Sequence, residues 1–219
     1  MRIDIITVPY RYDAPNQGLG AGPDALVRGG IAKRIRDAGH EVTDPVAALL
    51  PDDEREAGQT GTNIGRLGAH TAALVKRSRE DGARVLALVG EDTAVIGVVA
   101  GVQQAHGAAA RIGLVWIDAH GDFNTPKTSY SGILAGMPVA IMAGLDGPRM
   151  RAAAGMLAPI PTERILIAGA RDLDNQEETL LNATSVGLVT GKQLSEPGAL
   201  AQAIESLEQW CDLLVMHID

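Results

Sequence analysis

The chain has 219 residues, of which 46% are hydrophobic and 3% aromatic, and this length is sufficient for one well-buried domain. Its formal net charge of −8, with no basic stretch to offset it, argues against nucleic acid and anionic membranes as partners. No apolar run reaches transmembrane length. The single cysteine, Cys211, cannot form an internal disulfide, which favours a reducing compartment and hence a cytoplasmic location.

The predicted elements alternate between strands and helices along the chain. Strands are expected over residues 2–8, 40–43, 85–89, 112–117, 165–168, 186–189 and 212–218. Helices are expected over residues 24–38, 63–81, 93–105, 134–142, 176–181 and 198–209. Residues 45–62 are rich in Pro, Asp, Glu and Gly and are expected to form a surface excursion. The alternation predicts an α/β fold, a three-layer α-β-α sandwich with a mostly parallel sheet, in a single domain over residues 1–219.

Acidic residues follow four of the predicted strands, after Val89, Ile117, Gly169 and Ile218. In parallel α/β sheets, ligand sites lie outside the carboxyl ends of the strands. We therefore expect these four loops, far apart in the sequence, to converge on one crevice.

The loop after the strand at 112–117 holds two carboxylates and an imidazole, in Asp118, His120 and Asp122. If the strand continues through residues 118 and 120, their side chains project to the same side. Burying these groups without partners would be costly, and a divalent cation would resolve the conflict. The mixed oxygen and nitrogen ligands suit Mn, Zn or Fe better than calcium. A solvated turn with a chance histidine is the alternative.

This loop, residues 118–126, resembles the D-A-H-x-D-x-N-T-P signature of the ureohydrolase superfamily, the arginases and agmatinases. Other stretches resemble further motifs of the family in the same order, at residues 18–26, 131–138, 169–177 and 216–219. The stretch 169–177 resembles the arginase-type G-x-R-D-x-D-x-x-E. Together these motifs place the chain in the arginase-like branch and imply its fold.

The resemblance implies a metal-dependent hydrolase that cleaves a guanidino or amidino C–N bond and releases urea, with a metal-bridged hydroxide as nucleophile. It implies Mn²⁺, binuclear in the complete protein, a small guanidino-type substrate, and a homo-oligomer, either a trimer or a hexamer. Asp118 and Asp219 would bridge two ions, His120 would bind one and Asp122 the other. Asp118 and His120 are the expected catalytic residues.

Three more residues match amino-acid-binding positions of the family, namely Asn124, Ser131 and Asp174. Ordinary loop capping is the alternative interpretation of these three side chains. In the family, an asparagine that helps hold the substrate α-carboxylate stands where this chain has Ile133. A histidine that shuttles protons stands where this chain has Ala135. These two differences make free arginine a doubtful substrate.

Two further differences concern the metal ligands. Asp92 stands where the family has a metal-binding histidine, and it is either a ligand itself or a cap of the following helix. Asp219 matches the first aspartate of a motif that needs a second one two residues later, so the chain is expected to be truncated at its C-terminus. The alternative function, favoured by the lost residues, is a catalytically silent subunit or binding scaffold with the ureohydrolase fold.

Overall fold

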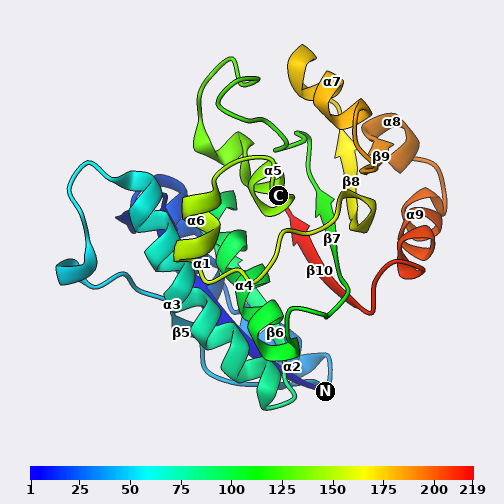
Figure 1. The fold of residues 1–219 in the computed structure, drawn as a ribbon. Helices are drawn as coiled ribbons and strands as arrows, with labels where there is room; N and C mark the ends of the chain where they lie inside the picture. Colours follow the sequence, from blue (N-terminus) through cyan, green and yellow to red (C-terminus); the bar gives the residue numbers. More distant parts are fainter. The chain divides into compact units, whose positions relative to one another are not determined.

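The computed structural model describes residues 1–219 and divides them into two compact units. The first unit comprises Met1–Gly107 and Arg149–Leu157, and the second comprises Ala108–Pro148 and Ala158–Asp219. The prediction of one domain over the whole chain stays a prediction. Figure 1 draws the helices and strands that make up the two units and labels those for which there is room.

The strands follow the predicted alternation closely. They are β1 (Arg2–Val8), β2 (Tyr10–Arg11), β3 (Ala14–Pro15), β4 (Glu41–Val42), β5 (Val46–Ala47), β6 (Arg84–Val89), β7 (Ile112–Ile117), β8 (Ile165–Ala170), β9 (Gly187–Thr190) and β10 (Leu213–Ile218). All pairings are parallel except that of β2 with β3. The predicted α/β class with mostly parallel sheets is therefore confirmed.

The helices lie between these strands, and none of them combines the length and the apolar character needed to span a bilayer. They are α1 (Gly22–Arg28), α2 (Ile31–Asp37), α3 (Thr60–Glu80), α4 (Val95–His106), α5 (Pro138–Met142), α6 (Pro148–Ala153), α7 (Asn175–Asn182), α8 (Gly191–Leu194) and α9 (Ala199–Glu208).

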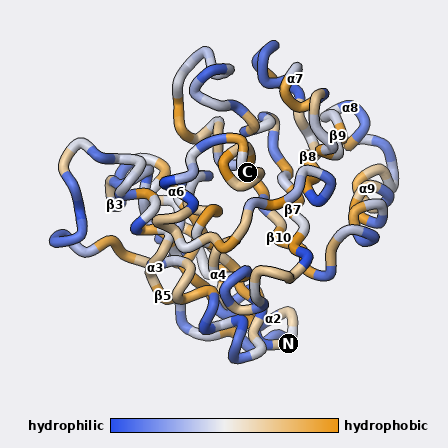
Figure 2. Tube along the Cα trace, viewed as in Figure 1, coloured by the Kyte–Doolittle hydropathy of each residue, from blue (hydrophilic) through white to orange (hydrophobic).

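The first unit has three layers around β1, which pairs with β6 on one edge and with β4 and β5 on the other. Successive side chains of a strand point to opposite faces of its sheet. Accordingly, Ile5 packs in a cluster with residues of α1 and α2, whereas Val8 packs in a second cluster with Leu67 of α3. The surface excursion expected over residues 45–62 is found only in part, because this stretch contains β5, the buried residues Ala48 and Leu50, and the first turn of α3. Figure 2 shows hydrophilic residues on the chain between β5 and α3.

Helices α3 and α4 approach each other closely because glycines stand at their contact. A Cβ atom added to Gly97 would lie 2.6 Å from the carbonyl oxygen of Gly68 and 2.8 Å from its Cα. A Cβ atom on Gly101 would lie 2.6 Å from the carbonyl oxygen of Ala72. The obstacles are backbone atoms, which cannot rotate away, so these glycines set the spacing between the two helices.

The second unit contains a parallel sheet with the strand order β10-β7-β8-β9. One face of this sheet packs against α8 and α9 through a cluster that includes Val115, Leu166 and Leu207. The opposite face carries Trp116, which is fully buried and stacks on His217 of β10 with ring centroids 3.7 Å apart. The six-residue pairing of β10 with β7 places Ile218 opposite Ile117, at the carboxyl ends of the two strands.

Three predicted helix boundaries are wrong for identifiable reasons. The helix expected over residues 24–38 is two helices, because the chain turns at Gly29 and Gly30, with a φ of 83° at Gly30. The helices expected from residues 93 and 134 each begin as a short 3₁₀ turn, over Asp92–Ala94 and Leu134–Gly136. The sequence interpretation also missed α6, α8, β5 and the short β2–β3 pair.

The contact between α3 and α4 gives a first prediction. Gly97→Ala should destabilise the first unit by about 1–3 kcal/mol, because the added methyl group meets immobile backbone. Gly22→Ala is the control, since its added Cβ would meet nothing within 4 Å. Urea unfolding followed by circular dichroism measures both variants. Equal midpoints for Gly97→Ala and the unmodified protein would contradict the prediction.

Candidate metal centre

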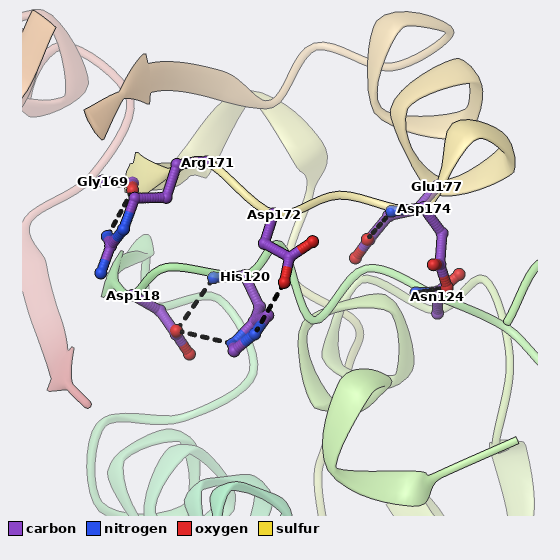
Figure 3. Close-up of polar contacts among 8 residues, drawn as sticks. All are labelled: Asp118, His120, Asn124, Gly169, Arg171, Asp172, Asp174 and Glu177. Atoms are coloured by element: carbon purple, nitrogen blue, oxygen red, sulfur yellow. Dashed lines mark hydrogen bonds and ion pairs between the residues drawn. The ribbon is translucent and has the colours of Figure 1, made fainter. Parts of the chain in front are cut away.

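The predicted ligands Asp118 and His120 come together through a turn and not through a continued strand. Strand β7 ends at Ile117, and Asp118 Oδ1 then accepts a hydrogen bond from the backbone N–H of His120 at 2.9 Å. The same oxygen lies 3.2 Å from His120 Nδ1. Aspartate commonly forms such a local turn with the backbone two residues ahead. The expectation that strand alternation aligns the two side chains is therefore wrong, although they do meet (Figure 3).

Asp118, His120 and Asp122 form a group that could hold a metal ion. Each offers one ligand atom, and these three atoms lie within 4.8 Å of one another. Donor atoms of one first-row ion each lie about 2 Å from it and hence within about 4 Å of each other, so small side-chain movements suffice. Asp118 and Asp122 are only 4% and 5% exposed, which a solvated turn does not explain. Two buried carboxylates beside an imidazole fit a divalent cation.

The backbone around Asp122 is anchored on the first turn of α5. Asp122 has a φ of 45°, in the left-handed region that aspartate tolerates better than most residues. Its carbonyl oxygen accepts hydrogen bonds from the N–H groups of Val139 at 3.0 Å and Ala140 at 3.3 Å. Two residues on, the N–H of Asn124 donates to the carbonyl oxygen of Gly136. The unusual conformation at Asp122 is thus held by the helix that follows the loop.

A second anchor comes from Glu177 on α7, whose part in this loop the sequence interpretation missed. Glu177 is 3% exposed, and its Oε1 accepts the N–H of Phe123 at 2.8 Å. Its Oε2 accepts the N–H of Asp174 at 3.2 Å, as part of a capping box. Burial raises the pKa of Glu177, and these two hydrogen bonds oppose that rise. The spacing of Asp174 and Glu177 signals the capping box, but nothing local in the sequence signals Phe123.

The three predicted substrate-binding residues make loop-capping contacts. Asn124 donates through Nδ2 to Asp174 Oδ2 at 3.2 Å, and that carboxylate oxygen also lies 3.3 Å from the N–H of Tyr130 (Figure 3 shows the first contact). Ser131 lies apart from this pair and accepts the N–H of Ile133 at 3.2 Å. The structure therefore joins Asn124 and Asp174 but not Ser131. Their role in binding substrate stays a prediction.

Asp219 lies at the same edge of the sheet as Asp118. Its N–H donates to the carbonyl oxygen of Ile117 at 3.0 Å, so it follows β10 just as Asp118 follows β7. On the other side of β7, the carbonyl oxygen of Ala119 accepts the N–H groups of Arg171 and Asp172 after β8. Three of the four expected loops therefore meet at one edge. Asp219 is not one of the three residues in the candidate metal group.

Asp92 belongs to the first unit, where it begins the 3₁₀ turn after β6. The cap of this turn is Glu91 and not Asp92, because the Glu91 carboxylate accepts both the N–H and the hydroxyl of Thr93. Burial raises the pKa of Glu91 to about 7, against the opposing effect of its hydrogen bonds to Thr93. The suggestion that Asp92 serves as the cap is thus wrong, and its role as a ligand stays a prediction.

Comparisons with known proteins agree with the sequence motifs. A sequence model of the arginase family matches residues 1–219. The arginase of Bacillus caldovelox is 28% identical over 226 residues, which cover 99% of this chain and 75% of that protein. Human arginase-1 is 28% identical over 191 residues, which cover 84% of this chain and 58% of that protein. The crystal structure of the Bacillus subtilis arginase superposes with a TM-score of 0.85 at 26% identity, covering 100% of this chain and 74% of that one.

The geometry of the candidate metal group gives a second prediction. Mn²⁺ should stay bound to the unmodified protein through desalting, and Asp122→Asn should weaken binding by at least about tenfold because it removes a buried anionic ligand. Asp172→Asn is the control, since it removes an equal charge from an exposed residue 3.8 Å from His120. Elemental analysis and calorimetric titration measure the effect. Equal retention of manganese in both variants would count against the site.

Proposed function

The chain belongs to the arginase family, and we propose that it is a Mn²⁺-dependent ureohydrolase that cleaves a guanidino or amidino C–N bond and releases urea. The observation that carries the proposal is the burial of Asp118 and Asp122 beside His120 at the carboxyl edge of a parallel sheet. Ligand sites in such sheets lie at this edge. The arginases that the chain matches over almost all of its length support the same conclusion.

In this proposal the second unit supplies most of the metal ligands. Asp118, His120 and Asp122 would hold one ion between them or share two, with Asp219 as a further ligand from the adjacent strand. The role of Asp92 as a ligand follows only from the resemblance to the family motif. When bound, Mn²⁺ supplies Lewis-acid chemistry and lowers the pKa of a nearby water. The carboxylates balance its charge, and the anchored loop keeps them in place.

We propose further that the substrate lacks an α-carboxylate. Asn124 and Asp174 already bind each other, and Asn124 Oδ1 accepts a hydrogen bond from the hydroxyl of Thr128 at 2.9 Å. The loop that follows exposes apolar surface, with Ile133 52% exposed and Tyr130 67% exposed. A free amino acid would bring a charged carboxylate beside these apolar side chains. Guanidino compounds with an uncharged or apolar tail match it better.

The 3₁₀ turn Leu134–Gly136 offers no proton carrier. Ala135 has no titratable group, and its neighbours Ile133 and Leu134 are apolar. A positioned acid or base typically contributes about 10²–10⁴-fold to steps that move a proton. Turnover should therefore be slow unless another residue takes this role.

The alternative is a catalytically silent member of the family that acts as a subunit or scaffold. The residues at positions 92, 133 and 135, which replace a histidine, an asparagine and a histidine of the family, favour this alternative. A homo-oligomer and a cytoplasmic location are part of both proposals. Sedimentation of the purified protein and localisation in its native cell would test them.

The missing proton carrier gives a third prediction. Urea release from arginine by the unmodified protein should be weak, and Ala135→His should raise it by ~10²-fold because it supplies an imidazole beside the site. Ala135→Leu is the control, since it adds bulk without a titratable group. A urea-release assay with Mn²⁺ measures both. Fast turnover of arginine that Ala135→His leaves unchanged would show that another group moves the proton.

The apolar loop gives a fourth prediction. Ile133→Asn should lower the KM for arginine by about tenfold, because an amide can donate to the α-carboxylate. The KM for agmatine, which lacks that carboxylate, should change little. Steady-state kinetics on arginine, agmatine and an alkylguanidine would decide. If the unmodified protein releases urea from none of these compounds while retaining Mn²⁺, the silent alternative is favoured.

A further inference from the structure

We infer that Glu177 is a positioning residue that holds the metal loop, which we define as residues 118–124, in its binding conformation before any ion arrives. The inference rests on the proposed metal site in that loop. The two carboxylate oxygens of Glu177 bind different segments of the chain. Oε1 accepts the N–H of Phe123 in the metal loop, and Oε2 accepts the N–H of Asp174 at the start of α7.

Glu177 is buried, and both oxygens of its carboxylate are engaged in these contacts. The residue is 3% exposed, although glutamate usually lies at the surface of a protein. A buried carboxylate requires hydrogen-bond partners, and here both partners are backbone groups. Phe123, whose N–H it accepts, is itself fully buried, so in the intact protein this N–H depends on Glu177 for its acceptor.

Gly121 provides an independent observation of the same contact. A Cβ atom added to Gly121 would lie 2.7 Å from Glu177 Oε1 and 2.9 Å from Leu173 Cδ2. Real Cβ atoms do not approach other heavy atoms this closely, so a side chain at residue 121 would have to displace the ends of the Glu177 and Leu173 side chains. Gly121 therefore leaves the space that the carboxylate of Glu177 occupies beside the loop.

The position of this contact explains how it acts on the metal ligands. Phe123 directly follows Asp122, whose φ of 45° is less favoured than an ordinary backbone conformation. The carbonyl oxygen of Asp122 is held by α5, and the next N–H is held by Glu177. Without the hydrogen bond from the N–H of Phe123 to Glu177, the backbone at Asp122 can relax, and the Asp122 carboxylate moves away from Asp118 and His120. Glu177 therefore acts through the loop.

The capping box of α7 offers a competing explanation for Glu177, and the two can be separated. A cap alone would stabilise the first turn of α7 and leave the metal loop unaffected. A positioning residue protects the N–H of Phe123 from exchange with solvent. Amide hydrogen exchange on the metal-free protein distinguishes these effects, because it reports on the loop and the helix separately.

The experiment compares three variants with one matched control. Glu177→Ala removes both acceptors, Glu177→Gln keeps one, and Gly121→Ala pushes against Oε1. Glu178→Gln is the control, because Glu178 is the exposed neighbour of Glu177 on the same helix. Exchange of the Phe123 amide should rise about tenfold or more in Glu177→Ala and Gly121→Ala, and less in Glu177→Gln. Exchange at Leu114 in β7 should stay unchanged, which shows that the sheet remains folded.

Calorimetric titration with Mn²⁺ alone then separates this inference from the proposed function. Affinity should fall in the order unmodified protein, Glu177→Gln, Glu177→Ala, while the control variant binds as the unmodified protein does. If the unmodified protein retains no Mn²⁺ but exchange at Phe123 responds as expected, the proposed function fails and the positioning role stands. If exchange at Phe123 is unchanged in both Glu177→Ala and Gly121→Ala, the positioning role is overturned whatever the metal affinity.

Discussion

The parallel pairing of β7 with β10 and β8 is the constraint on which the candidate site depends. Six residues of β10 align with six of β7, from Leu213 opposite Ile112 to Ile218 opposite Ile117. Because both strands run in the same direction, their carboxyl ends coincide, and Asp118 and Asp219 follow at the same level. A slip of this register by one residue would turn every side chain of β10 to the other face of the sheet. The stack of His217 on Trp116 lies two residues before Asp219 and Asp118 and resists such a slip.

Burial is the second constraint, because burying charged groups in the loop after β7 costs free energy unless they have partners. Asp118, Asp122 and Glu177 are three carboxylates of low exposure in one small region. Their charges have different compensation. The carboxylate of Glu177 accepts hydrogen bonds from two backbone N–H groups. The carboxylate of Asp118 accepts a hydrogen bond from the backbone N–H of His120 and also lies within hydrogen-bond distance of His120 Nδ1. This division separates Glu177, whose partners are backbone groups, from the carboxylates of the candidate metal group.

The positions of the longer strands along the chain and of the loop with the candidate metal group could be predicted from the sequence, whereas the contacts that bring its side chains together could not. Apolar runs such as 112–117 are bounded by charged residues, so their limits are visible in the sequence, and the structure has the same limits for β7. The split of residues 24–38 at Gly29 and Gly30 was also visible in principle, because paired glycines disfavour a helix. The hydrogen bond from Phe123 to Glu177 spans 54 residues, and no local pattern encodes it. Asp174 illustrates the limit most clearly, since its partners Asn124 and Tyr130 come from a loop remote in the sequence.

The distribution of tryptophan gives the protein an unusual optical property. Trp116 is fully buried against His217, and Trp210 is 46% exposed after α9; both belong to the second unit. These are the two tryptophans of the chain. Emission excited at the red edge of protein absorbance therefore comes from the second unit alone, as a short-wavelength component from Trp116 and a long-wavelength component from Trp210. The first unit does not emit at that excitation, so the unit that contains the candidate metal group carries its own intrinsic probe.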